Sequence, residues 1–92
     1  MTDRPAIIVR LPAILVDLFP GAQRRVEMKA GSVAEMVDGL EKLWPGMRDR
    51  LCDTRPAIRR HINVFVDGER VRLDHELSAG DEVFVLTAIS GG

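Results

Sequence analysis

GSVAEMVDGLEKLWPG, residues 31–46, predicts a single amphipathic helix. Ser32 is suited to cap its N-terminus, and Glu35 three residues later completes the pattern of a capping box. Pro45-Gly46 ends the helix. The apolar residues recur every three or four positions and form one stripe, which consists of Val33, Met36, Val37, Leu40, Leu43 and Trp44. A stripe on one side predicts a helix that packs against one face of a β-sheet.

Two strands are predicted on the N-terminal side of this helix. Residues 6–11 (AIIVRL) are rich in β-branched side chains and stop at Pro12. Residues 23–28 alternate between apolar and charged side chains, as a half-exposed strand does. A Pro20-Gly21 turn signal lies between them, so we expect a hairpin. Residues 12–19 are interpreted either as an extension of the first strand or as a packed loop.

The C-terminal half predicts a short helical turn at residues 47–51, a loop at 53–60, and then three strands. Residues 61–67 (HINVFVD) alternate, with Ile62, Val64 and Val66 on one face. The turn signal Asp67-Gly68 follows, so Val71 and Leu73 are expected in a short returning strand. Residues 82–89 form the last strand after a turn at 78–81. The order β-β-α-β-β-β predicts an α+β domain at residues 1–89, with residues 90–92 as a flexible tail.

Composition excludes several classes of partner and site. The net charge is −1, with 13 basic and 14 acidic residues, which gives no electrostatic basis for binding nucleic acid or an anionic membrane. The N-terminus lacks a signal-peptide pattern, and no apolar run is long enough to span a bilayer. Cys52 is the one cysteine, so no internal disulfide can form, and a reducing cytoplasm is the expected compartment.

The body of the domain carries no recognisable catalytic or metal-binding pattern. Cys52, His61 and His75 are scattered along the chain, so we expect no metal site and interpret Cys52 as a structural cysteine. No glycine-rich phosphate loop is present, and no cofactor is expected to bind. The basic stretch between Arg48 and Arg60 is interpreted as a solvated loop or, alternatively, as a contact patch for an acidic partner.

The last two residues, Gly91-Gly92, are the remaining candidate for chemistry. Glycine has no Cβ, so a diglycine tail is thin enough to enter a narrow cleft with its carboxylate foremost. A free carboxylate is a weak electrophile and must be activated, most simply as an acyl-adenylate. Because the chain has no visible nucleotide site, a separate enzyme would have to bind ATP and activate the carboxylate. This interpretation holds only if the tail is functional.

Several segments together resemble the MoaD/ThiS-type sulfur carriers, which are ubiquitin-like β-grasp proteins. The resemblance rests on the predicted strand order and on the sequences Asn63-Val64-Phe65-Val66-Asp67-Gly68-Glu69, Val71-Arg72, Leu77, Gly80-Asp81-Glu82-Val83 and Ala88-Ile89-Ser90-Gly91-Gly92. It implies a mixed sheet covered by one main helix. The family often has proline before the tail, where this chain has Thr87-Ala88.

The resemblance also implies a mechanism and partners. The Gly92 carboxylate would be adenylated by an ATP-dependent, ubiquitin-activating-like enzyme and converted to a thiocarboxylate, with Gly91 keeping the tail narrow. A sulfur donor such as a sulfurtransferase would load the tail. An acceptor enzyme of molybdenum cofactor, thiamin thiazole or cysteine biosynthesis would receive the sulfur. The chain itself would be a protein co-substrate and not an enzyme.

An outward-facing apolar trio is predicted beside this tail. If the alternate residues of the last strands face the helix, then Phe65, Phe84 and Leu86 point away from it. Such a trio suggests a docking surface for the activating enzyme. The alternative is that residues 12–19 fold over part of it.

Two other functions stay open at the level of sequence. The chain could be a ubiquitin-like modifier joined through Gly92 to lysines of other proteins, or a non-covalent interaction module whose glycine end is incidental.

Overall fold

A computed structural model describes residues 4–55 and 57–87 of the 92-residue chain. Its elements in chain order are β1 (Ala6–Arg10), α1 (Ala13–Leu18), β2 (Arg25–Lys29), α2 (Val33–Leu43), α3 (Met47–Leu51), β3 (Ile62–Val66), β4 (Glu69–Arg70) and β5 (Glu82–Thr87). The predicted boundary between residues 89 and 90 and the Gly91-Gly92 tail lie outside the described residues.

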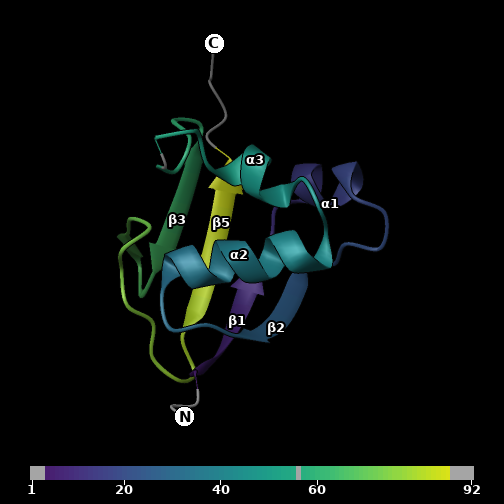
Figure 1. The fold of residues 1–92 in the computed structure, drawn as a ribbon. Coiled ribbons are helices and arrows are strands. Elements are labelled where there is room, and N and C mark those ends of the chain that lie inside the picture. Colours follow the sequence, from purple (N-terminus) through teal and green to yellow (C-terminus); the bar gives the residue numbers. More distant parts are fainter. Residues whose placement is uncertain (1–3, 56, 88–92) are drawn as a thin grey trace.

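The strands form one mixed sheet in the order β2-β1-β5-β3-β4. β5 is the central strand, parallel to β1 and antiparallel to β3, whereas β1–β2 and β3–β4 are antiparallel pairs. α2 and α3 lie on one face of this sheet, as Figure 1 shows. The predicted α+β, β-grasp architecture with one main covering helix is confirmed.

α2 begins as its sequence predicts. The Ser32 hydroxyl accepts a hydrogen bond from the Glu35 N–H at 3.2 Å, and Glu35 Oε1 accepts one from the Gly31 N–H at 2.7 Å. These bonds satisfy two amide groups near the start of the helix. Arg4 adds an ion pair to Glu35 at 3.1 Å.

The core lies between the helices and the sheet. It contains the helix-facing residues of β1, β3 and β5 together with the stripe of α2, namely Ile7, Val9, Ile62, Val64, Val66, Val83, Val85, Val33, Met36, Val37 and Leu40. One predicted member of the stripe is wrong, because Leu43 is 52% exposed. At 100° per residue, Leu43 falls at the margin of the stripe rather than at its centre.

The segment between the first two strands is the main difference from the predicted fold. Residues 12–19 were expected to extend the first strand or to form a loop, but residues 13–18 form the helix α1. Leu15 is buried, and Val16 and Phe19 pack against the core. α1 therefore adds a second helical contact at the end of the sheet where β5 ends (Figure 1).

The strand after β3 is shorter than predicted. β3 and β4 are joined by Asp67 and Gly68, both with positive φ (53° and 79°), as in a type I′ hairpin turn. β4 ends at Arg70, so the expectation that Val71 and Leu73 continue a strand is wrong. Ala34 N–H instead donates to the Leu73 carbonyl at 2.9 Å, which ties this segment to α2.

Across residues 4–55 and 57–87, no helix is both long and apolar enough to cross a bilayer.

Candidate functional site: the open sheet face and the strand that leads to the tail

β5 is paired with β1 from Glu82 to Phe84 and with β3 as far as Thr87, the last residue that the structure describes. Thr87 lies opposite Ile62 of β3, and Val83 lies opposite Val9 of β1. The predicted reacting residues, Gly91 and Gly92, follow outside the described part of the chain. Pairing with β3 therefore fixes the backbone of β5 up to Thr87.

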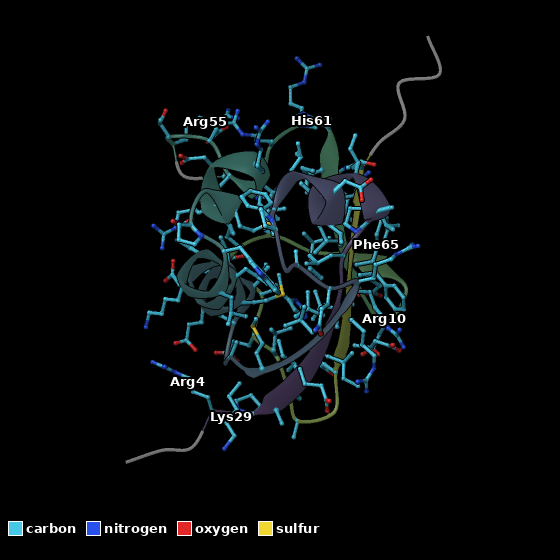
Figure 2. All side chains as sticks on the ribbon, turned by 90° about the vertical axis from the view of Figure 1, so that its right-hand side faces the viewer. Arg4, Arg10, Lys29, Arg55, His61 and Phe65 are labelled. Carbon is cyan, nitrogen blue, oxygen red and sulfur yellow. The ribbon has the colours of Figure 1, made fainter. Side chains whose placement is uncertain are left out.

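The sheet face opposite α2 carries the three predicted apolar residues. Phe84 is 40% exposed, Leu86 is 45% exposed and Phe65 is half-buried. Phe65 and Phe84 lie directly opposite each other in the β3–β5 ladder, and Leu86 lies opposite Asn63. Figure 2 shows Phe65 projecting from the side of the sheet away from α2. We call Phe65, Phe84 and Leu86 the open apolar face.

Arginines flank the open apolar face, and sequence reasoning missed them. The register aligns one row across all five strands, in the order Arg25, Arg10, Phe84, Phe65 and Arg70. Arg10 Nε donates to Glu82 Oε2 at 2.6 Å on this face, with both side chains partly exposed. The alternation of side chains within each strand indicates on which face each arginine lies. The alignment of the arginines across the sheet, however, depends on which strands pair. An apolar centre with a charged rim is typical of a protein-binding surface.

The alternative interpretation, in which residues 12–19 fold over part of the trio, does not account for the exposure of Phe84 and Leu86. α1 turns Leu15 into the core, and Phe84 and Leu86 keep 40% and 45% of their surface exposed. Two further apolar side chains of α1, Ile14 and Leu18, are also exposed.

The remaining reactive groups do not come together into a site. Cys52 is buried, and burial raises the pKa of its thiol, which disfavours the nucleophilic thiolate. His61 lines a surface recess with Leu18 and Phe19, whereas the His75 carbonyl accepts from the Val33 N–H at the start of α2. Within the described residues no group of three or more His, Cys, Asp or Glu side chains could hold a metal ion.

The basic stretch between Arg48 and Arg60 is partly neutralised by local ion pairs. Arg48 pairs with Asp38, and Arg55 pairs with Asp53. Hydrogen bonds from the Arg55 side chain, together with backbone N–H groups, lower the pKa of Asp53 to about 2. Arg59 Nε donates to the backbone carbonyl of Asp49 at 2.6 Å.

Comparisons with known proteins place the chain in one family. The model of the ThiS family matches residues 9–92. The sulfur carrier protein CysO of Mycobacterium tuberculosis is 30% identical over 92 residues, which cover 94% of this chain and 98% of that protein. Small archaeal modifier protein 1 of Haloferax volcanii is 29% identical over 84 residues, which cover 90% of this chain and 97% of that protein.

A solved structure agrees with these likenesses. The structure of the BexX/CysO complex of Amycolatopsis orientalis contains a chain that superposes with a TM-score of 0.83 at 32% identity. The match covers 94% of the present chain and 99% of that chain.

Proposed function

Since this chain belongs to the ThiS family of ubiquitin-like sulfur carriers, we propose that the Gly92 carboxylate is the group that carries sulfur. The observation that carries the proposal is the extent of the family match, which continues through the diglycine at residues 91–92. Proteins of this type are small carriers rather than enzymes, so the chemistry is assigned to partners.

The proposed reaction needs two steps on the same carboxyl group. A Gly92 carboxylate oxygen attacks the α-phosphorus of ATP in the activating enzyme, and pyrophosphate leaves. Hydrosulfide then attacks the acyl carbon and expels AMP, leaving a terminal thiocarboxylate. Where the donor is the persulfide of a sulfurtransferase, the persulfide sulfur makes this attack, and a thiol then reduces the acyl disulfide to the thiocarboxylate. An acceptor enzyme of molybdenum cofactor, thiamin thiazole or cysteine biosynthesis takes the sulfur. Gly91 and Gly92 present no Cβ that would obstruct a narrow channel.

In the proposed reaction, the folded domain positions the tail. β5 is paired with β3 up to Thr87, so the tail starts from a fixed point. The open apolar face lies on the same strand, since Phe84 and Leu86 belong to β5. We propose that the activating enzyme binds this face while the tail enters its active site. Exposed aromatic and aliphatic side chains are typical anchors of such contacts.

Whole-protein mass spectrometry tests the carrier function. The chain is co-expressed with its activating enzyme and sulfur donor, and the matched control lacks Gly92. We expect a mass increase equal to the exchange of one oxygen for sulfur in the native chain and no increase in the control. An unchanged native mass, with the activating enzyme shown to be active, would contradict the proposal.

A second candidate function is supported by the likeness to small archaeal modifier protein 1. A modifier would join its Gly92 carboxylate to lysine amines of other proteins through isopeptide bonds. The same mass-spectrometric experiment separates the two functions, because conjugation gives adducts on other proteins rather than a sulfur-loaded chain. Finding neither product would leave the non-covalent interaction module as the function.

A further inference from the structure

A recess of about 600 Å³ lies among three segments that are distant in the sequence. Its lining comes from the end of α1, from Gly46 and α3, and from Arg59 and His61 before β3. Figure 1 shows α1, α3 and the start of β3 at the end of the sheet where β5 ends. The volume is within the range of ordinary binding clefts.

The walls of the recess are held in place by contacts within the domain. A Cβ at Gly46 would meet Phe19 Cε1 at 3.2 Å, so the Phe19 ring packs closely on the backbone that begins α3. The Gly46 N–H donates to both carboxylate oxygens of Glu41 at 3.1 Å, which ties the same backbone to α2. On the third side, the Ile62 N–H donates to the Arg59 carbonyl at 2.9 Å. The recess is therefore preformed, and a partner would not have to order it.

Two arginines give the recess a basic character. Arg59 Nε donates to the Asp49 carbonyl at 2.6 Å, and the Arg59 side chain makes no other hydrogen bond to a described residue. Arg50 is exposed and, unlike Arg48 and Arg55, is in no ion pair with a described residue. Asp49 is the one acidic residue of the lining. Two guanidinium groups therefore stand against one carboxylate, which favours a ligand with negative charge.

An exposed apolar strip leads to the recess. Leu18 lines the recess and is 47% exposed, and Ile14, one helical turn earlier on α1, is 59% exposed. Residues four apart lie on the same side of a helix, so these two side chains are neighbours. Apolar side chains beside arginines are typical of protein-binding surfaces. A small free anion would use the arginines alone, so the strip favours a protein as the ligand.

The recess lies where an enzyme that reacts with the tail has to approach. Thr87 pairs with Ile62, and His61 of the lining comes immediately before Ile62. The five residues after Thr87 span at most about 18 Å when fully extended. An enzyme that holds Gly92 in its active site therefore has its surface close to this end of the domain. The open apolar face lies on one side of the sheet, and α3 with the recess lies on the other.

We propose that this recess binds a carboxylate-bearing segment of the activating enzyme. This contact rests on the proposed function, because the reaction at Gly92 is what brings that enzyme to this end of the domain. An Asp or Glu side chain of the enzyme enters the recess and pairs with Arg50 and Arg59, and a neighbouring apolar side chain packs on Leu18. Contacts on both sides of the sheet fix the direction in which the tail enters the active site.

A cross-linking experiment tests the chemistry of this contact. The chain contains two lysines, Lys29 and Lys42, so Arg50→Lys adds one amine at the recess. In the complex with the activating enzyme, a water-soluble carbodiimide joins an amine to a carboxylate that it contacts. We expect mass spectrometry to find residue 50 joined to an Asp or Glu of the enzyme. The matched variant Arg72→Lys, outside the recess lining, should give no such product from residue 72.

Two results of this experiment would overturn the proposal. One is the absence of any product from residue 50 to the enzyme in a complex that has been shown to form. The other is a product that joins residue 50 to the Gly92 carboxylate of the chain itself in place of the enzyme, because the tail would then be the occupant of the recess.

A charge reversal separates this contact from the carrier function. Arg50→Glu should weaken binding to the activating enzyme about three- to tenfold in isothermal titration, including in a chain that lacks Gly92 and cannot react. Lys29→Glu makes the same change in charge at the opposite end of the sheet, as Figure 2 shows, and should leave the dissociation constant unchanged.

The two proposals fail in different ways. Native affinity of Arg50→Glu, or equal weakening by Lys29→Glu, would overturn the recess contact and leave the reaction at Gly92 intact. A native chain that gains no sulfur would contradict the carrier function, whereas weaker binding of Arg50→Glu without Gly92 would still support the recess contact. Circular dichroism of each variant confirms that the fold is native, as expected for exposed positions.

Discussion

The two sides of β5 carry similar side chains in opposite environments. Val83 and Val85 face the helices and are fully buried, whereas Phe84 and Leu86, one position along, are 40% and 45% exposed. An antiparallel or mixed sheet can leave one face in water, but that face is then usually polar. The exposed side of β5 instead keeps large apolar residues at its centre and places arginines around them.

The residues on one side of β5 stabilise the fold, and the residues on its other side are exposed and can contact another protein. Burial of Val83 and Val85 removes apolar surface from water and stabilises the fold. Phe84 and Leu86 contribute less to folding, because much of their surface stays exposed. Variants on the two sides should therefore affect different measurements.

The largest effect is expected from Val85→Arg. The substitution places a charge without a partner among buried apolar residues, so we expect a loss of more than about 4 kcal/mol in the free energy of unfolding. A small domain has a total stability of about 5–15 kcal/mol, so much of the protein would unfold. Urea unfolding followed by circular dichroism measures this, and a native-like midpoint would show that Val85 is not in the core.

The aromatic pair on the open face should give an intermediate effect. Phe65 and Phe84 lie directly opposite each other, so a double-mutant cycle of the two alanine substitutions should give a coupling of about 0.5–1.5 kcal/mol in unfolding free energy. The control combines Phe84→Ala with Leu43→Ala on α2, where additivity within about 0.5 kcal/mol is expected. Strict additivity of the Phe65 and Phe84 variants would show that the rings do not interact.

Leu86→Arg should change stability by less than about 1 kcal/mol, because the added charge reaches water directly. It is the same substitution as Val85→Arg, one residue away, so the pair compares the two sides of β5 with matched chemistry. Unfolding in urea under identical conditions is the measurement. A loss of several kcal/mol for Leu86→Arg would place this residue in the core and remove the distinction between the faces.

The smallest effect concerns the loop before β3. Asp53 accepts hydrogen bonds from Arg55 and Ala57 N–H, and its pKa is lowered to about 2 from an ordinary value of 3.8. A lowered pKa in the folded state stabilises the fold above about pH 4, and this contribution is lost as the pH falls toward 2. Asp53→Asn should therefore lower the urea midpoint slightly at pH 7 and by less at pH 2.

Asp17→Asn, at an exposed carboxylate on α1, is the control for that measurement. A difference between the native chain and Asp53→Asn that grows as the pH falls would contradict the assignment.

The sequence was sufficient for the elements with clear periodicity. Alternation in residues 61–67 predicted which side chains of β3 are buried, and the Ser32–Glu35 pattern predicted the start of α2. α1 was missed because Ala13–Leu18 is a short apolar run, which does not distinguish helix from strand, and because its Pro12 cap makes no side-chain hydrogen bond.

The candidate site was predictable only in part. Alternation identified Phe65, Phe84 and Leu86, because the faces of a strand follow from the strand itself. The alignment of Arg10, Arg25 and Arg70 with these residues depends on which distant strands pair. The periodicity of a single sequence does not show that pairing. The end of β4 at Arg70 was likewise not predictable, because the alternation of Val71 and Leu73 favours a longer strand.

The most direct test is ATP–pyrophosphate exchange catalysed by the activating enzyme. It shows whether the tail reacts while the activating enzyme binds the open apolar face. We expect exchange with the native chain, none with a chain that lacks Gly92, and a Michaelis constant raised about tenfold with little change in kcat for Leu86→Arg. Exchange at the native rate without Gly92, or a Michaelis constant unchanged by Leu86→Arg, would contradict these roles.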